Sequence, residues 1–461
     1  MKYAVRLCLA ALAVLAVLQF VRPRIPQGPA TAEIQAPTAV KAILSEKCYS
    51  CHSNERRLAW FDEIQPGYWL VRQDVLEARE RLNFSTIGSQ PAAQQKAALY
   101  EAVTMIQLGA MPLPRFLALH PDAKVSPDDL AVLKAYLSPW STEDGGRSAT
   151  AASGTKGGPD PVSPTQEFIS LSKAPLEYNG LGMSTGIGDW KLISITDRGD
   201  NNTLRLVVGN DLAMQAIQAG KVLPWPDGAQ IAKIAFQKER NAEGLIVPGQ
   251  FVQIELMAKD AQRYGATSGW GWGRWRGPTL KPYGESVAYL RECTGCHEPV
   301  KGNDNVYTLP ISQARVVQAE TINNAAAALP RSVPYQPLAW TPVTMFVNPR
   351  NQTMSALFSN DVAQGALRAQ LQGTKRISEY RLPSGSVLAL ITWRQRDDPH
   401  WFGARIPSDV ASVEFLVAGP EQSVSYSCHP NDSSNVDCGT RTSSDDRKRV
   451  LLSLVPAQYP H

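Results

Sequence analysis

The sequence has little charge and no basic cluster. Charged residues make up 19% of its 461 residues, and 46 Lys and Arg against 42 Asp and Glu leave a formal net charge of only +4. Nucleic-acid binding needs Lys and Arg gathered on one face, so we predict no nucleic-acid partner. The chain is too long for one hydrophobic core, and its ordinary apolar content of 43% indicates several globular domains.

Cysteine is also scarce, which makes the position of each one informative. Of the seven cysteines, Cys8 lies in the N-terminal segment and four lie in two C-x-x-C-H motifs. The other two, Cys428 and Cys438, lie ten residues apart in a polar loop. Such a pair is typical of a disulfide in an oxidising compartment, and we predict one between them.

The N-terminal segment, residues 1–26, is typical of export. Lys2 and Arg6 precede an apolar run that ends at Val21, which is the order of charge and apolarity found in export signals. No clear small-x-small cleavage site follows, and the run is short for a membrane span. We interpret it either as a cleaved signal or as an anchor through residues 4–21. Both interpretations predict a periplasmic protein.

The two C-x-x-C-H motifs, CYSCH from Cys48 and CTGCH from Cys293, predict covalent haem attachment. On a helix, positions i, i+3 and i+4 share one face, so two thioethers can hold a porphyrin edge while the histidine reaches the iron. The sequence therefore predicts two haem c groups. The predicted attachment residues are Cys48, Cys51, Cys293 and Cys296, and the predicted iron ligands are His52 and His297.

Zinc binding and thiol redox chemistry are the alternatives for these motifs. A zinc site needs four ligands, usually from two pairs at suitable spacing, whereas these motifs lie far apart and each has its own histidine. A thioredoxin-like dithiol would not require the histidine. Haem attachment is therefore the interpretation that uses every residue of the pattern.

Residues 30–140 show helical patterns and no competing strand pattern. At the last helix, Ser126 can cap, Pro127 suits the first turn, and two aspartates suit the positive end of the helix. We predict an all-α c-type haem domain. The expected helices cover residues 38–51, 67–84, 91–109 and 126–138.

A second axial ligand for the first haem is expected in the stretch GAMPLPRFLALHPDAK, which offers Met111 and His120. Met111 lies between a helix and two prolines, in a rigid loop that can aim a thioether. Met opposite His suits electron transfer, although most methionines simply fill gaps in a core. We predict Met111 as the ligand and His120 as a surface or capping residue.

Several stretches of this segment resemble the bacterial haem-binding domain family of anchored periplasmic proteins. They are CYSCHSN, IQPGYWLV, LNFS and MPLPRFLALHPDAKVS, and the resemblance spans residues 42–137. It implies a small helical cytochrome with one haem behind a short N-terminal anchor.

Residues 141–165 are rich in Gly, Ser, Thr and Pro and are predicted to be a flexible linker. The following segment, residues 166–312, mixes strand patterns with a short helix that ends at Gly220. Lys233 interrupts the apolar strand pattern QIAKIAF and shares a face with Ile231. It is either a solvated edge residue or a lysine aimed at a haem, and composition does not decide between them.

This segment resembles the cytochrome P460 family over residues 193–309. The stretches that carry the resemblance are VVGNDLAMQAIQAGKVLPWPDGAQIAKIAFQK, ELMAKDAQRY, GWGWGRW and CTGCHEPVKGNDNVYT. The resemblance implies a β-sheet domain with one c-type haem, His297 as proximal ligand, and an open distal position for small nitrogen ligands. Typical members oxidise hydroxylamine and carry a lysine cross-link to the haem.

The family's D-G-x-x-x-x-K lysine matches Lys233, after Asp227 and Gly228. The resemblance therefore implies Lys233 as the cross-linking residue. The related cytochromes c′-β share the fold, lack the cross-link and bind nitric oxide or other gases. A matching lysine is necessary for the cross-link without being sufficient, so both alternatives stay open.

After a linker at residues 313–332, residues 333–461 repeat the pattern of the preceding domain. Asn360-Asp361 corresponds to Asn210-Asp211, and Gly385 corresponds to Gly228. Leu390 replaces Lys233, and no C-x-x-C-H motif follows. We predict a degenerate, haem-free copy in which His429 has no metal role.

The predicted fold is multidomain, with an all-α c-type haem domain followed by two mainly-β α+β sheet domains of the P460 type, the second degenerate. The first functional hypothesis is an oxidoreductase in which the second haem oxidises hydroxylamine or a related nitrogen compound and the His52/Met111 haem accepts the electrons. The alternative is a non-catalytic cytochrome that binds nitric oxide or transfers electrons. The sequence does not identify the redox partner protein.

Overall fold

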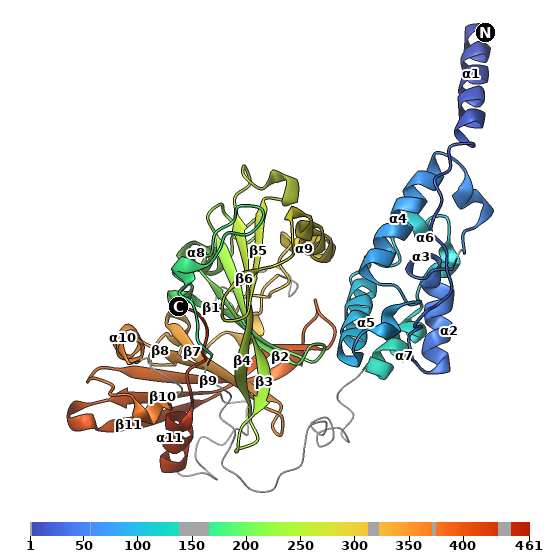
Figure 1. Cartoon of the computed structure of the whole chain (residues 1–461). Coiled ribbons are helices and arrows are strands. Elements are labelled where there is room, and N and C mark those ends of the chain that lie inside the picture. Colours follow the sequence, from blue (N-terminus) through green and yellow to red (C-terminus); the bar gives the residue numbers. More distant parts are fainter. Residues whose placement is uncertain (1, 56, 138–165, 312–321, 371–374, 432–443) are drawn as a thin grey trace. The chain divides into compact units, whose positions relative to one another are not determined.

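The computed structural model describes residues 2–55, 57–137, 166–311, 322–370, 375–431 and 444–461. The chain divides into two compact units, Met1–Gly146 and Arg147–His461 (Figure 1). The predicted linker at residues 141–165 lies outside the described residues, and so does part of the linker predicted at residues 313–332.

The described part of the first unit contains helices and no strand, as predicted. The expected start of its last long helix is confirmed, because the Asp129 amide donates to Ser126 Oγ at 3.0 Å. The Ser126 amide in turn donates to the Asp129 carboxylate at 3.1 Å, which completes a capping box. The helices are α1 (Lys2–Leu18), α2 (Thr38–Lys47), α3 (Tyr49–His52), α4 (Gly67–Arg81), α5 (Ala92–Gln107), α6 (Pro114–Leu117) and α7 (Pro127–Leu137).

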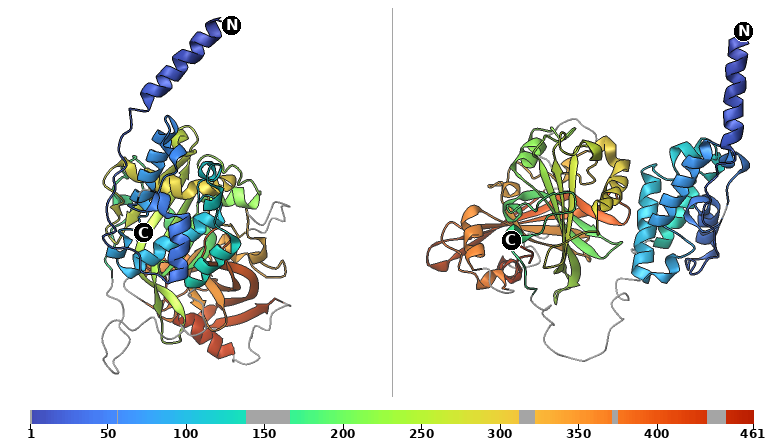
Figure 2. Two further views of the ribbon diagram at one scale, coloured as in Figure 1. Left: turned by 90° about the vertical axis from the view of Figure 1, so that its right-hand side faces the viewer. Right: turned by 45° about the horizontal axis from the view of Figure 1, so that its top comes forward.

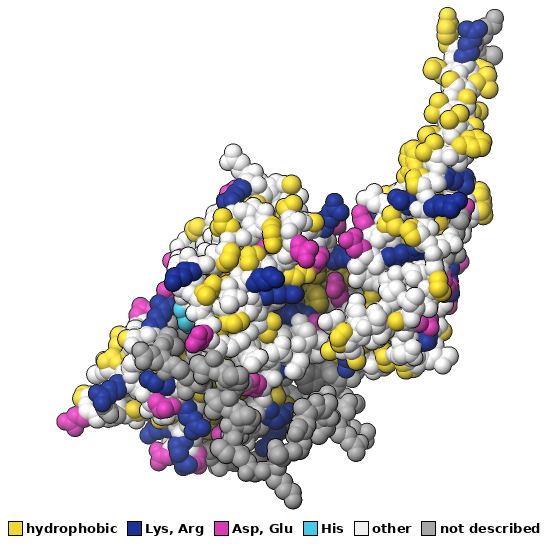
Figure 3. Space-filling model, viewed as in Figure 1, with side chains coloured by type: hydrophobic (Ala, Val, Ile, Leu, Met, Phe, Trp, Pro, Cys, Tyr) yellow, Lys and Arg dark blue, Asp and Glu magenta, His cyan; other side chains and the backbone are white. Residues whose placement is uncertain are grey.

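Helix α1 exposes its apolar side chains along its length (Figure 3). Leu7, Leu9 and Val17 are each more than half exposed, at 71%, 61% and 65%. Among the helices that the structure describes, none is both long and apolar enough to cross a membrane.

The second unit is built on one antiparallel sheet of 11 strands in the order β3-β2-β1-β10-β9-β8-β7-β4-β5-β6. Strand β11 pairs with β10, and an additional β3–β4 pairing closes the path on itself. The strands are β1 (Lys191–Arg198), β2 (Thr203–Gly209), β3 (Gln230–Arg240), β4 (Ile246–Lys259), β5 (Trp270–Arg276), β6 (Lys281–Pro282), β7 (Thr341–Asn348), β8 (Thr353–Ser359), β9 (Val387–Asp397), β10 (Ala404–Ala418) and β11 (Val424–Pro430). The helices are α8 (Asp211–Gln218), α9 (Leu290–His297), α10 (Asp361–Ala369) and α11 (Ser444–Ser453).

We call residues 166–311 the first half of this sheet unit and residues 322–461 the second half. Strands β1 to β4 pair in sequence order in the first half, and β7 to β10 do so in the second. The halves join where β1 meets β10 and where β4 meets β7, so equivalent strands make both junctions. The first strand of each half therefore pairs with the fourth strand of the other half, so the two halves have equivalent places in the sheet.

The correspondence predicted between the two Asn-Asp pairs holds in atomic detail. Asn210 caps α8 by accepting from the amide three residues later at 3.0 Å, and its Nδ2 donates to the Gly228 carbonyl at 2.8 Å. Asn360 caps α10 in the same way at 3.0 Å and donates to the Gly385 carbonyl at 2.9 Å. Both glycines need positive φ, +87° and +90°, which glycine adopts without strain.

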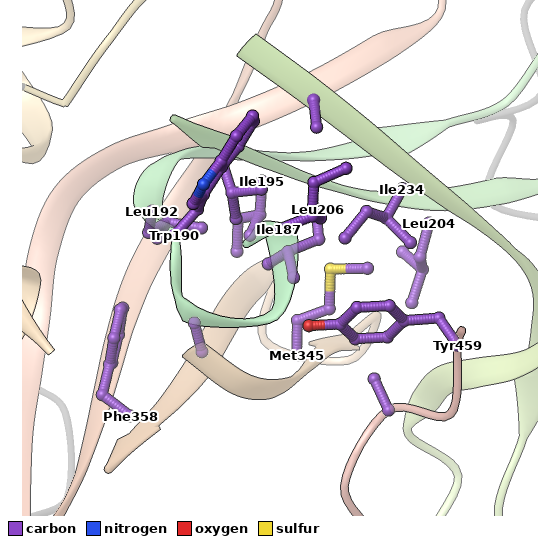
Figure 4. Close-up of a cluster of buried hydrophobic side chains, with 14 of the residues drawn as sticks. Ile187, Trp190, Leu192, Ile195, Leu204, Leu206, Ile234, Met345, Phe358 and Tyr459 are labelled. Carbon is purple, nitrogen blue, oxygen red and sulfur yellow. The ribbon is translucent and has the colours of Figure 1, made fainter. Parts of the chain in front are cut away.

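The largest hydrophobic cluster draws side chains from both halves (Figure 4). Leu206 and Ile234 of the first half belong to the same cluster as Met345 and Phe358 of the second. The chain also returns to the first half at its C-terminal end, marked C in Figure 2, where Tyr459 enters this cluster. The predicted boundary between two sheet domains therefore falls inside one compact unit with a shared core.

Candidate functional site

The second C-x-x-C-H motif occupies the C-terminal part of α9, which packs on the outer face of the first half. Cys293 is 8% exposed and lies in a buried cluster with Ile231 of β3, Trp272 of β5 and Tyr289. The helical spacing expected for the motif is therefore present, with its first cysteine turned toward the sheet. Apolar and aromatic side chains of this kind suit contact with a flat porphyrin ring.

His297 is oriented by a hydrogen bond of its Nδ1 atom to the Asn305 carbonyl at 2.7 Å. A carbonyl only accepts, so Nδ1 carries the proton and Nε2 carries the lone pair that a metal ligand needs. Burial lowers the pKa of His297 to about 4, although the hydrogen bond to Asn305 opposes the shift. The ring is therefore neutral near pH 7, the form that binds iron.

The turn that presents this carbonyl is held by a buried ion pair. Asp304 and Asn305 both have left-handed backbones, with φ of +47° and +62°. Lys259 Nζ lies 2.8 Å from the Asp304 carboxylate and is 7% exposed, and Trp270 Nε1 donates to the Asp304 carbonyl at 2.8 Å. Strands β4 and β5 thus fix the position of the carbonyl that orients His297.

Lys233 lies on the same face of the sheet as this motif. It is directly opposite Val207 of β2, and Val207 belongs to the buried cluster that contains Cys293. Directly opposite residues share a face, so the Lys233 side chain projects toward the layer that contains α9. The structure thus places the lysine on the face that carries the second C-x-x-C-H motif, and whether it cross-links to a haem stays a prediction.

A polar strip runs from Lys233 across the two neighbouring strands. Lys233 is directly opposite Glu255 of β4, which is directly opposite Arg274 of β5. The Lys233 amine is ion-paired with Glu255, and Arg274 Nε lies 3.4 Å from the same carboxylate. One half-buried carboxylate is therefore shared between two cations.

The charges of this strip shift the protonation of its members. Burial lowers the pKa of Lys233 to about 8, with Glu255 opposing the shift and Arg205 adding to it. Burial alone would raise the pKa of Glu255, but Lys233, Arg274 and Arg205 together hold it well below its usual range. At neutral pH the glutamate is ionised, and the lysine gives up its proton more readily than an exposed lysine.

The first motif has the same histidine arrangement in a different setting. The helix expected over residues 38–51 is interrupted at Cys48, which lies between α2 and α3, and His52 ends α3. The Nδ1 atom of His52 is bonded to the Leu82 carbonyl at 2.9 Å, which again leaves the lone pair on Nε2. Burial lowers the pKa of His52, so this ring is also neutral.

The two axial-ligand candidates opposite His52 differ in their surroundings. His120 Nε2 is bonded to Asp62 Oδ1 at 2.8 Å, and its ring stacks on Phe116 at 4.0 Å between centroids. Met111 is half-buried in the loop between α5 and α6. His120 is thus engaged by a carboxylate, and the role of Met111 as a ligand stays a prediction.

The cysteines of the two motifs are not disposed as redox thiols. Burial raises the pKa of Cys48 and of Cys293 to about 12 each, and it also raises the pKa of Cys51. Redox-active C-x-x-C pairs have lowered thiol pKa values, so this burial disfavours the dithiol alternative. In the described part of the chain, no three His, Cys, Asp or Glu side chains are grouped so that they could hold a metal ion.

The second half has Leu390 at the position of Lys233, as predicted from the repeat. Leu390 is directly opposite Glu414, just as Lys233 is directly opposite Glu255. Leu390 is fully buried in a cluster that includes Leu451 of α11. Where the first half has a lysine beneath a C-x-x-C-H helix, the second half has leucine packed against leucine.

The predicted disulfide concerns Cys428 of β11 and Cys438, and Cys438 lies outside the described residues. The pairing therefore stays a prediction. His429 of the same strand packs edge-on against Phe415, with 5.7 Å between ring centroids. This ring contact gives His429 a packing role.

Sequence reasoning did not identify Glu255, Arg274 or the Lys259–Asp304 pair. The signal for Glu255 was a single charged residue in the apolar strand pattern FVQIEL, the same kind of interruption that singled out Lys233. Nothing comparable marks Asp304, whose importance depends on a contact with a distant strand.

Comparison with known families agrees with this geometry. Residues 13–139 match the family model of a haem-binding domain, and residues 185–308 match the model of cytochrome P460. No curated protein matches the chain. Each matched region contains one C-x-x-C-H motif, so both resemblances seen in the sequence are confirmed and together support a haem cytochrome.

Proposed function

We propose that this chain, which combines a haem-binding domain with a cytochrome P460 domain, is a periplasmic dihaem c-type cytochrome. In this proposal the cofactor at the second motif oxidises hydroxylamine or a related small nitrogen compound, and the His52/Met111 site accepts the electrons. Residues 4–21 would anchor the protein if they are not removed. The observation that supports the proposal most is Lys233 on the face that α9 covers, beside a neutral His297 whose Nε2 is available as a ligand.

The residues around the second motif fit a haem. Cys293 and Cys296 supply thioether attachment, and His297 supplies an axial nitrogen. Trp272 lies 4.5 Å from the His297 ring between centroids, and its indole N–H is buried without a hydrogen-bond partner among the described residues. A buried donor of this kind is costly unless a bound group accepts from it. When bound, the haem would supply an iron centre that takes electrons from the substrate.

Lys233 and Glu255 are the residues of this face best suited to act beside the haem. The lowered pKa of Lys233 increases the fraction of neutral amine, which is the reactive form for covalent attachment to a porphyrin. Glu255 orients that amine through the ion pair. Because its own pKa is held well below its usual range, Glu255 is a weak base, and its role is to orient the amine rather than to accept protons.

Two measurements on the fully haem-loaded protein test the proposal. Steady-state assays with hydroxylamine and an artificial electron acceptor should show turnover. Mass spectrometry of tryptic haem peptides should show the Lys233 peptide joined to the Cys293–His297 peptide. Protein that carries both haems but neither turns over nor contains the joined peptide would contradict the enzymatic proposal.

One observation favours a second candidate function, a non-catalytic cytochrome that binds nitric oxide or relays electrons. The Lys233 amine is ion-paired with Glu255, and an ammonium held by a carboxylate is not a nucleophile. If this pair persists in the mature protein, the lysine stays free and the site resembles the uncross-linked relatives. Nitric oxide binding to the reduced protein without hydroxylamine turnover would support this function.

A further inference from the structure

The turn between β9 and β10 belongs to the second half, yet it contacts the segment that follows the second motif. His400 Nδ1 lies 2.7 Å from the Tyr307 carbonyl, and since a carbonyl only accepts, the histidine donates. The Trp401 ring lies 5.4 Å from the Tyr307 ring between centroids, in an edge-to-face arrangement. Two consecutive residues of the second half therefore fix one residue of the first half.

Tyr307 is in turn joined directly to the motif. Its hydroxyl donates to the Cys296 carbonyl at 2.6 Å. Its ring lies 5.0 Å from the His297 ring at an interplanar angle of 81°. Tyr307 thus contacts both the attachment segment and the predicted axial ligand.

The β9–β10 turn is itself rigidly held. The Gly199 amide donates to the Gly403 carbonyl at 2.8 Å, and the Arg198 guanidinium lies 4.0 Å from the centre of the Trp401 ring. Arg198 is fixed by Asp200, with Nε to Oδ1 at 2.6 Å, and both side chains are buried. Cation–π contacts with a buried guanidinium add to this rigidity. Because the turn is held in place, its contacts through His400 and Trp401 also hold Tyr307 in place.

We propose that His400 and Trp401 are positioning residues for the axial ligand His297 and act on it through Tyr307. This inference rests on the proposed function, specifically on a haem at Cys293 and Cys296. The second half then contributes to the haem site by positioning its axial ligand, His297. Groups that orient an axial histidine tune its bond to the iron and the reduction potential, so the turn affects both.

The test compares full-length, haem-loaded variants with the unmutated protein. His400→Ala and Trp401→Ala should both shift the iron–histidine stretching band of the reduced second haem in resonance Raman spectra. They should also shift the midpoint potential of that haem and leave the first haem unchanged. His400→Asn should restore the original band, because its amide nitrogen can replace Nδ1 as donor to the Tyr307 carbonyl.

Two further variants separate positioning from general destabilisation. Trp340→Ala removes a half-buried aromatic residue of the second half that packs on Tyr335, so it should lower stability without moving the band. Tyr307→Phe removes the hydroxyl bond to Cys296, keeps the aromatic ring, and should shift the band by a smaller amount.

The outcomes distinguish this inference from the proposed function. Unshifted bands and potentials in His400→Ala, Trp401→Ala and Tyr307→Phe, with stability losses like that of Trp340→Ala, would overturn the positioning role alone. An unmutated protein that carries no haem on Cys293 and Cys296 would overturn the proposed function and this inference together.

Discussion

The two halves of the sheet unit have the same backbone plan and different outer faces. Both keep a glutamate at the same register position, the half-buried Glu255 in β4 and the fully buried Glu414 in β10. In the first half Glu255 is paired with Lys233 on the neighbouring strand, whereas Glu414 is held by Arg447 of the covering helix at 2.9 Å. The cation thus comes from the sheet in one half and from the helix in the other.

This difference indicates what a haem site needs beyond the fold. A buried carboxylate requires a cation, and each half supplies one from a different element. The second half therefore keeps its glutamate, Glu414, stabilised by Arg447 although it has Leu390 where the first half has a lysine. The strand order and helix caps are shared, so the capacity to hold a haem depends on the side chains of the outer sheet face and on the helix that covers it rather than on the backbone plan.

Removing the attachment cysteines should have the largest effect, because it leaves the first half, like the second, without a C-x-x-C-H motif. Cys293→Ala combined with Cys296→Ala should remove all covalent haem from that half and halve the total measured by pyridine haemochrome assay. Cys428→Ala in the second half is the matched control and should leave haem content unchanged. Undiminished haem in the double variant would show that the attachment site lies elsewhere.

The next largest effect is expected from exchanging Lys233 and Leu390, which occupy equivalent positions on β3 and β9. The quantity affected is the free energy of unfolding. Leu390 is fully buried, and Arg447 and Tyr426 already hold the glutamate opposite it. Leu390→Lys would bury an unmatched ammonium and should lower the free energy of unfolding by about 3 kcal/mol. Denaturant unfolding measures this change.

The reverse exchange, Lys233→Leu, is the matched control. The Lys233 side chain is 27% exposed, and Arg274 still faces Glu255 when the lysine is gone. A leucine there should therefore cost much less stability than Leu390→Lys. Equal tolerance of both exchanges would show that the face of the second half is not filled as tightly as its buried leucines indicate.

The titration of Lys233 should distinguish a free lysine from a cross-linked one. Its pKa is lowered from 10.5 to about 8, so between these values the unfolded chain binds a proton that the folded chain does not. Stability should therefore rise with pH across this window, by on the order of 1 kcal/mol relative to Lys233→Leu. Leu390 has no titratable group, so this rise of stability with pH is expected from the first half and not from the equivalent position of the second.

The measurement is the difference in unfolding free energy between the unmutated protein and Lys233→Leu at several pH values from 7 to 11, a range set by the ordinary pKa of lysine. A rising difference supports a free amine and the non-catalytic alternative. A flat difference supports a lysine whose nitrogen is already bonded to the porphyrin.

Much of this comparison could be predicted from sequence because it depends on local patterns. The two C-x-x-C-H motifs, the correspondence of Asn210 with Asn360 and the exchange of Lys233 for Leu390 are all visible in short stretches. Each is a local signal, and the structure places them in the expected type of element except Cys48, which lies between α2 and α3 where one continuous helix was expected.

The remaining features could not be predicted because they depend on strand register and on distant contacts. The Lys233–Glu255 pair requires the exact alignment of β3 with β4, which is interrupted by irregularities after Ala235. The merging of the halves into one sheet depends on a few residue pairs such as Ile246 with Val347. The contact of His400 with Tyr307 joins residues from different halves, and no local pattern marks it.

The smallest expected effect is a shift in the reduction potential of the second haem. It concerns the turn that orients His297, which has no counterpart described in the second half. Asp304→Asn removes the charge that Lys259 holds and loosens the Asn305 carbonyl, which weakens the hydrogen bond to His297. A weaker bond makes the imidazole a poorer donor to iron, so the potential of the second haem should rise by roughly tens of millivolts. Glu298→Gln is the control, because Glu298 forms only an exposed ion pair, and spectroelectrochemical titration should find its potential unchanged. Equal shifts in both variants would mean that net charge, and not the orientation of His297, sets the potential.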